Sequence, residues 1–308
     1  MQTGASNTGI GAESLEANTT GGSNVAVGHK ALEANTTGAT NTAIGVEALE
    51  SNTTAQNNTA VGYYSGNANT TGTQNVSVGA YSFYTNTQSN RNTALGYNTL
   101  SSHNLTSDSN GYNTCGTQNT FIGGLVGDTT TTASSNTAVG YNAFTANTTG
   151  AENVAMGTFC LEANTTGANN VAIGHRALDA NTSANNNTAV GFAALGANTT
   201  GTENTAVGKG ALDANTTGNN SVAFGRDSLT DNTTGSNNTG LGDNALANNT
   251  TADNNTAVGK NALVANITGA GNTAIGRSSQ LTSTTGNDNT SVGLDSLEDL
   301  TNGADNTA

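Results

Sequence analysis

Few residues of this chain are of the types that act as nucleophiles, general bases or metal ligands. It contains three histidines and two cysteines, and it has no tryptophan. His29 and His175 each follow a glycine at equivalent places of a repeated sequence, whereas His103 lies in an irregular stretch. No two of them have the spacing of metal ligands or of a catalytic triad. We therefore expect solvated histidines, no metal or other cofactor, and no enzymatic activity.

The carboxylates are spread along the chain, and many share one place in the repeated sequence. This place holds Glu16, Glu33, Glu50, Glu162, Asp179, Asp213 and Glu298. Calcium-binding repeats need acidic pairs in glycine-rich loops, but the same place also holds Thr, Gly, Ala and Val, so a calcium site is not expected. The net charge of -14 favours solubility and disfavours nucleic acid or anionic membranes as partners.

Tyrosines gather beside the one irregular stretch of the chain. The candidates for contact with a ligand in this region are Tyr63, Tyr64, Tyr81, Tyr84, Tyr97, His103 and Tyr112. Aromatic side chains beside polar loop residues can stack on sugar rings, which predicts a surface glycan or host receptor as partner. The alternative is that the tyrosines fill an interface between chains and that the irregular stretch is a plain surface loop.

A repeat of seventeen residues must position these side chains. Glycine recurs every seventeen residues from Gly11 to Gly96 and again from Gly123 to Gly293, and the one step between these series is twenty-seven residues. The unit at 41–57 reads Asn-Thr-Ala-Ile-Gly-Val-Glu-Ala-Leu-Glu-Ser-Asn-Thr-Thr-Ala-Gln-Asn, which defines positions 1 to 17 of each coil. Low apolar content would favour disorder, but strict periodicity is typical of a solenoid.

The periodicity predicts an all-β fold, a parallel β-solenoid (β-roll) of seventeen coils. We expect a single array over 1–308, with coils at 1–96 and 119–308 and a ten-residue insertion within 101–112. The array starts and stops inside a repeat, so we also expect the chain to be part of a longer fibre. Each coil should turn sharply at its glycine, where the missing Cβ permits positive φ: Gly28, Gly45, Gly62, Gly140, Gly174 and Gly208 are examples.

Positions 2 and 4 should share one face of a short strand, because alternate strand residues point the same way. Position 3 is small everywhere except at Phe121, so we expect the opposite face to meet a close neighbour, such as another chain. Leucine occupies position 9 in twelve of the seventeen coils and forms a second apolar row. Together with position 4 it gives about two large side chains per coil, worth roughly 3 to 6 kcal/mol if buried.

That contribution is smaller than the cost of ordering seventeen residues, so stability must come from stacking and from other chains. Asparagines of the Asn-Thr-Thr-Gly corner could form hydrogen-bonded ladders. The Ala-Leu-Glu-Ala segment at 31–34 is too short for a helix and should be strand or irregular backbone.

Cys115 and Cys160 lie three coils apart, which is too far for a disulfide bond within the chain. We expect free thiols, with a disulfide bond between chains as the alternative.

The repeat resembles two families. The runs Asn-Thr-Ala-Val-Gly at 136–140 and Asn-Val-Ala-Ile-Gly at 170–174 are similar to the head repeats of trimeric autotransporter adhesins, which are left-handed parallel β-rolls of three chains. The longer form, which adds Ala-Leu and the Asn-Thr-Thr-Gly corner, resembles more closely the repeats of phage tail fibre and bacterial surface proteins that end in a self-cleaving chaperone domain. No coiled-coil stalk, membrane anchor or chaperone domain is seen in this sequence.

The resemblance implies a homotrimeric, extracellular fibre segment that attaches a virion tail fibre or a bacterial cell surface to a host or another surface. A phage tail fibre is the first expectation, and a bacterial trimeric adhesin or extracellular filament is the alternative. Neither requires membrane insertion. An ice-binding solenoid is a third reading, since regular threonine columns can bind ice. The adjacent threonines of each corner should point to opposite faces, which disfavours it.

Overall fold

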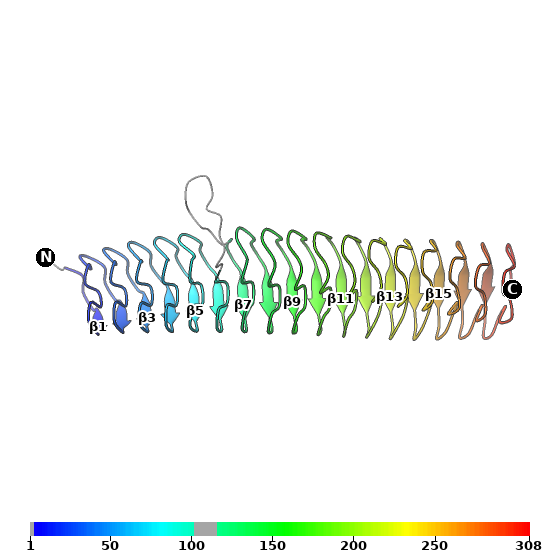
Figure 1. Cartoon of the computed structure of the whole chain (residues 1–308), viewed down its shortest axis with the longest axis horizontal. Helices are drawn as coiled ribbons and strands as arrows, with labels where there is room; N and C mark the ends of the chain where they lie inside the picture. Colours follow the sequence, from blue (N-terminus) through cyan, green and yellow to red (C-terminus); the bar gives the residue numbers. More distant parts are fainter. Residues whose placement is uncertain (1–2, 102–115) are drawn as a thin grey trace. The chain divides into compact units, whose positions relative to one another are not determined.

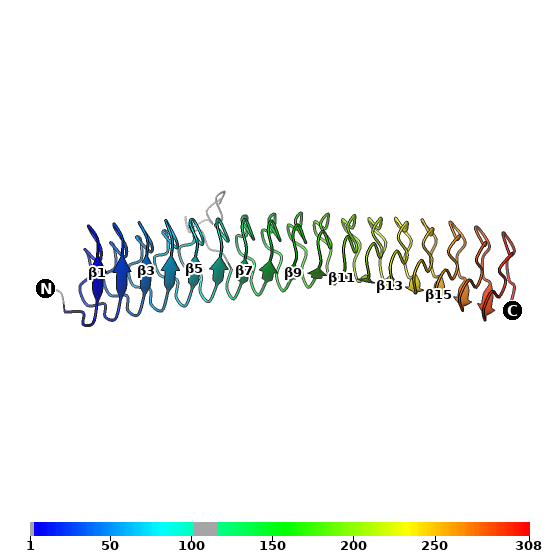
Figure 2. The same cartoon turned by 90° about the horizontal axis from the view of Figure 1, so that it is seen from below.

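The computed structural model describes residues 3–101 and 116–308, and it divides into two compact units, Met1–Asn153 and Val154–Ala308. Each unit is a parallel β-solenoid in which every coil contributes one strand of three residues. Within each unit the strands lie in one row, and the rest of each coil returns along a similar path (Figures 1 and 2). The predicted fold class is confirmed at this level.

The strands occupy positions 2 to 4 of the repeat throughout the described residues. In the first unit they are β1 (Thr8–Ile10), β2 (Val25–Val27), β3 (Thr42–Ile44), β4 (Thr59–Val61), β5 (Val76–Val78), β6 (Thr93–Leu95), β7 (Thr120–Ile122) and β8 (Thr137–Val139). In the second unit they are β9 (Val154–Met156), β10 (Val171–Ile173), β11 (Thr188–Val190), β12 (Thr205–Val207), β13 (Val222–Phe224), β14 (Thr239–Leu241), β15 (Thr256–Val258), β16 (Thr273–Ile275) and β17 (Thr290–Val292).

Within each unit, neighbouring strands pair in parallel without a register shift, so equivalent positions of successive coils stack. Thr42 pairs with Val25 on one side and with Thr59 on the other. The predicted insertion lies outside the described residues except for Ser101. It does not alter the register, because Thr93 of β6 pairs with Thr120 of β7 in the same way as elsewhere.

Each coil turns at the glycine of position 5, as predicted. The six named glycines have positive φ: Gly28 139°, Gly45 137°, Gly62 139°, Gly140 147°, Gly174 136° and Gly208 136°. A Cβ on Gly28 would lie 2.3 Å from the carbonyl oxygen of Gly45 in the next coil. Glycine is therefore required both by the backbone conformation and by the close approach of the neighbouring coil.

The interior of each coil differs from the sequence expectation. Ala43 at position 3, Ala48 at position 8 and Leu49 at position 9 are buried together. The strand turns its position 3 side chain inward, so Ile44 at position 4 lies outside and is 40% exposed. The expectation that position 3 meets another chain is wrong, because the close neighbour is the leucine row of the chain itself.

One coil reverses this pattern of small and large interior residues. Phe121 replaces the small residue at position 3 and is fully buried, while Gly127 replaces the leucine at position 9. A Cβ on Gly127 would lie 2.1 Å from Cε2 of Phe121. The phenylalanine ring therefore fills the space that leucine occupies in other coils.

Asparagines at positions 1 and 12 close the interior with hydrogen bonds between coils. At position 1, the Asn41 amide N–H donates to Asn24 Oδ1 at 2.9 Å, and Asn41 Nδ2 donates to the Ala55 carbonyl at 2.8 Å. At position 12, Asn35 Nδ2 donates to Asn18 Oδ1 at 2.9 Å and to the Gly38 carbonyl at 3.0 Å. The predicted ladder at the corner is confirmed, and position 1 adds a second one.

The segment between positions 6 and 10 is neither helix nor strand. Glu47 and Leu49, at positions 7 and 9, have φ of 55° and 51°, a conformation that side chains with a Cβ seldom adopt. It is held because the Glu47 N–H donates to the His29 carbonyl of the preceding coil and the Leu49 N–H to the Ser65 carbonyl of the following one. Hydrogen bonds in both directions along the stack thus replace local secondary structure.

Candidate functional site

The outer side of the strands is the first candidate surface. We call it the strand face, and it consists of the side chains at positions 2 and 4. Its large exposed apolar members are Ile10, Ile44, Val76, Val78 and Ile122 in the first unit, and Met156, Ile173, Val222, Phe224, Leu241, Ile275 and Val292 in the second. Contiguous apolar surface of this kind is characteristic of interaction sites.

The second candidate surface follows the glycine corner. We call it the loop face, and it consists of the side chains at positions 6, 7 and 10. Six of the seven lysines and arginines and five of the seven tyrosines are at position 6 or 7. Because the interior and the strands repeat with little change, the loop face is where successive coils differ in chemistry.

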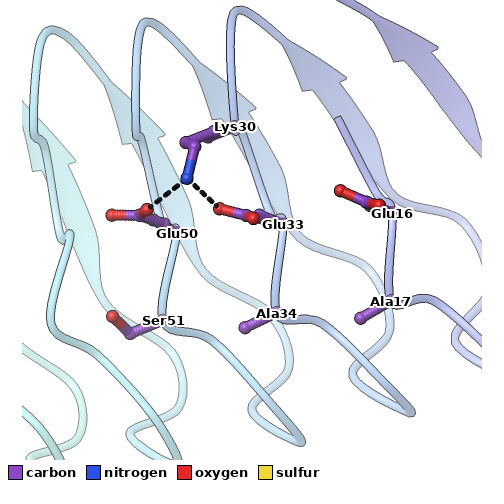
Figure 3. A pocket seen from close by; sticks show the side chains of 7 residues that line it. All are labelled: Glu16, Ala17, Lys30, Glu33, Ala34, Glu50 and Ser51. Carbon is purple, nitrogen blue, oxygen red and sulfur yellow. Dashed lines mark ion pairs between the residues drawn. The ribbon is translucent and has the colours of Figure 1, made fainter. Parts of the chain in front are cut away.

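A charged cluster occupies the loop face of the coils of β1 to β3. Lys30 Nζ lies 3.1 Å from Glu33 Oε2, 3.5 Å from Glu13 Oε2 and 3.7 Å from Glu50 Oε1. Figure 3 shows the lysine between Glu33 and Glu50. A hollow of about 660 Å³ opens beside them and is lined by Glu16, Ala17, Lys30, Glu33, Ala34, Glu50 and Ser51.

Three carboxylates of this cluster are close enough to share a cation, which the sequence did not predict. Oxygens of Glu13, Glu16 and Glu33 lie within 4.8 Å of one another. Lys30 pairs with two of the three, and its hydrogen bond to Glu33, with these carboxylates nearby, raises the pKa of its ammonium group. The lysine therefore already supplies a positive charge to this group.

A tyrosine cluster occupies the loop face of the coils of β4 to β6. Tyr64 and Tyr81 stack with their ring centroids 5.7 Å apart and their planes 16° apart. Tyr63 packs edge-on against Tyr64 at 4.3 Å and against Tyr81 at 5.4 Å. Tyr84 packs edge-on against Tyr81 at 5.5 Å, and Tyr97 does so at 6.4 Å.

The structure thus brings together five of the seven predicted ligand-contacting residues. His103 and Tyr112 lie outside the described residues. Tyr84 is at position 10, whereas the other four tyrosines are at positions 6 and 7, and Tyr64 and Tyr81 have φ of 57°.

Polar side chains border the tyrosine cluster at both ends. A hydrogen bond with Glu47 raises the pKa of the Tyr64 hydroxyl. Asn67 Nδ2 donates to Glu50 Oε2 at 2.9 Å, and at the other end Asn98 Nδ2 donates to Asp128 Oδ1 at 3.0 Å. The rings therefore lie between two groups of amides and carboxylates.

The second unit has its own aromatic cluster on the loop face, which the sequence analysis missed. His175 stacks on Phe192 with ring centroids 5.4 Å apart and planes 8° apart, and it meets Phe159 edge-on at 6.0 Å. The guanidinium carbon of Arg176 lies 5.9 Å from the centroid of Phe159. Adjacent coils carrying aromatic residues at positions 6 and 7 were the signal that could have revealed this cluster.

A smaller hollow, of about 370 Å³, lies next to this cluster. It is lined by Arg176, Asp179, Phe192, Ala193, Gly196, Ala197 and Asp213. Gly196 lacks the side chain that other coils carry at position 10, and a Cβ there would lie 2.7 Å from Asp213 Oδ1. Burial raises the pKa of both Asp179 and Asp213.

The remaining candidate groups are explained by their surroundings. Cys160 is buried at position 8, its Sγ lies 3.0 Å from the Gly157 carbonyl, and burial raises the pKa of the thiol to about 12. It is a free cysteine that fills a small interior site, as predicted. Cys115 lies outside the described residues. His29 Nε2 lies 3.9 Å from Glu13 Oε2 at the surface.

Across residues 3–101 and 116–308 there is no helix long and apolar enough to cross a membrane. No protein-family model matches the chain, and no curated protein matches its sequence.

Proposed function

We propose that this chain is a structural segment of an extracellular, self-associating fibre whose copies pack through the strand face. The observation that carries the proposal is the row of apolar side chains that every coil presents outward, such as Ile173 at 38% and Phe224 at 53% exposure. Burying this row would supply apolar contacts that the alanines and the single leucine in the interior of most coils do not.

The spacing of the coils supports another copy of the same chain as the partner. Strand-face side chains recur at about 4.8 Å, the distance between paired strands. A second copy has the same spacing, so its side chains can meet this face coil for coil. A partner with another period would lose register after a few coils.

The repeat resemblance supports three copies as the assembly and attachment to a host or another surface as its role. On this proposal the fibre belongs to a virion tail or to a bacterial cell surface. The chain acts by shape and adhesion and carries no catalytic function.

The test is the oligomeric state of the full chain by light scattering coupled to size exclusion. We expect a mass of three times 30.4 kDa for the wild type. We expect a single-chain mass for a strand-face variant, Ile173→Lys with Phe224→Lys and Leu241→Lys. The matched control places three lysines at exposed apolar residues of the loop face, Val46→Lys with Phe192→Lys and Leu294→Lys, and should retain the wild-type mass.

A folded wild-type chain that stays monomeric, or two variants with the same mass, would refute the proposal. Circular dichroism establishes whether each variant is folded. Since all six substitutions add the same charge at exposed sites, a difference between the variants reports the face that was changed.

A second candidate function, ice binding, is favoured by one observation. The strand face carries a column of threonines at position 2, such as Thr42 and Thr59. The threonines of the corner are a separate set: the Thr36 hydroxyl donates to the Thr53 carbonyl of the next coil and so is already hydrogen-bonded. Position 4 varies from Val61 to Phe224, so the face is uneven. A face buried between chains cannot bind ice, and thermal hysteresis in a monomeric wild type would favour this second function.

A further inference from the structure

The tyrosine cluster of the first unit has two exposed rings that pack on two half-buried ones. Tyr63 and Tyr97, both at position 6, are 45% and 60% exposed. They pack edge-on against Tyr81, which is itself stacked on Tyr64. The half-buried pair therefore holds the two exposed rings in place, so that little side-chain entropy would be lost when they contact a ligand.

The position between the two exposed rings holds a small residue. Ala80 is at position 6 of the intervening coil. Two coil steps separate Tyr63 from Tyr97, which is about 9.6 Å along the stack. Because both rings also pack against Tyr81, the three rings form one aromatic surface along these coils, on which successive sugar rings could lie.

The surroundings of the cluster determine which charge a ligand can carry. None of the residues at positions 6, 7 and 10 of these three coils is a lysine or an arginine. Carboxylates of Glu50 and Asp128 accept hydrogen bonds from Asn67 and Asn98 at the two ends. An anionic ligand would be repelled, whereas hydroxyl groups could hydrogen-bond to these amides and carboxylates.

We propose that the tyrosine cluster binds an extended, neutral, β-1,4-linked hexopyranose chain that lies along the coils of β4 to β6. Pyranoses with equatorial substituents have apolar C–H faces that pack on aromatic rings. An extended β-1,4-linked chain advances per sugar by a distance comparable to the step between coils, so one sugar can be placed at each coil. This binding does not depend on self-association, because the loop face and the strand face are separated by the glycine corner.

Isothermal titration calorimetry on the full chain tests the proposal with four hexasaccharides. Cellohexaose and N-acetylchitohexaose are the neutral β-1,4-linked probes, which distinguish plain from N-acetylated sugars. Maltohexaose is neutral but α-linked, and hexagalacturonate is anionic. We expect binding of one or both β-linked probes, and weaker or no binding of the other two.

Variants of the cluster identify the site. Tyr63→Ala with Tyr97→Ala should weaken binding by about tenfold or more, since both exposed aromatic rings that would contact the sugars are removed. Tyr141→Ala removes an exposed position 6 tyrosine outside the cluster and should change affinity by less than about twofold. Ala80→Leu keeps every tyrosine but adds a bulky side chain at position 6 of the coil between Tyr63 and Tyr97, and it too should weaken binding.

Light scattering and circular dichroism of each variant show whether a loss of sugar binding comes from the site itself or from a change in self-association or folding. The tyrosine variants should keep the wild-type mass and spectrum. Absence of binding of either β-linked probe, stronger binding of maltohexaose or hexagalacturonate, or unchanged affinity in both the double alanine variant and Ala80→Leu would overturn the proposal.

Discussion

The interior of the coils and the loop face differ in how freely their residues vary, although both are built from the same seventeen-residue unit. In the interior, a departure at one position is matched by a departure at another, as with Phe121 and Gly127. On the loop face, neighbouring coils carry first carboxylates with a lysine and then tyrosines, and these side chains are partly exposed to solvent.

The reason for this difference is packing. Interior side chains are enclosed by the coils before and after them, so their volume is constrained. Loop-face side chains meet solvent on one side and neighbours from adjacent coils on the other. A solenoid can therefore keep one framework and vary its surface chemistry along each unit.

The strongest test of interior constraint is a double-mutant cycle at Phe121 and Gly127. Phe121→Ala should cost about 3 to 5 kcal/mol because it leaves a cavity. Gly127→Leu should also destabilise, because a Cβ at Gly127 would lie 2.1 Å from Phe121 Cε2. The double variant restores the small and large residues of the other coils and should recover most of the loss.

Urea unfolding followed by circular dichroism measures this cycle. Leucine at position 9 adopts φ near that of Gly127, which is 60°, so the backbone should accept the substitution. Additive losses in the double variant would show that the two residues do not compensate for each other.

A direct comparison of the two regions is available within the coil of β11. Leu195 is fully buried, and Leu195→Ala should lower the free energy of unfolding by about 2 to 5 kcal/mol. Phe192 on the loop face is 52% exposed, and Phe192→Ala should change it by only about 0.5 kcal/mol. Similar shifts of the unfolding midpoint in both variants would contradict the division into interior and loop face.

The smallest expected effect concerns a loop-face carboxylate that is partly buried. Burial raises the pKa of Asp213 above its ordinary value of 3.8, and nearby Asp179 and Asp227 raise it further. The folded state thus binds more protons than the unfolded state between 3.8 and the raised pKa, so stability falls as pH rises through this window. Asp213→Asn removes the effect and should raise the melting midpoint at neutral pH by about 1 to 2 °C.

Melting curves at several pH values check this prediction. The advantage of Asp213→Asn over the wild type should disappear at pH below 3.8, where the carboxyl is protonated in both states. Glu298→Gln changes an exposed carboxylate at the same position of another coil and serves as the control. An Asp213→Asn variant that is less stable than the wild type at neutral pH would be the contrary result.

The sequence by itself determined the repeat length, the strand at positions 2 to 4 and the glycine corners. These follow from local rules: alternate strand residues share a face, and only glycine readily adopts positive φ against a close neighbour. The corner ladder of asparagines was predictable for the same reason, since identical residues of successive coils stack. The gathering of Tyr63, Tyr64, Tyr81 and Tyr97 followed from their neighbouring positions in the repeat.

Only the tertiary structure decided which strand face lies inside. The side chains of a strand alternate between two faces, so either Ala43 or Ile44 could have been interior. In the folded coil the leucine row packs against the smaller side chain, Ala43, and Ile44 is outside. The positive φ of Glu47 and Leu49 was equally hidden, because hydrogen bonds to the preceding and the following coil hold this segment and the residues' own preference does not. The aromatic cluster around His175 depends on that same backbone, which brings side chains of successive coils together.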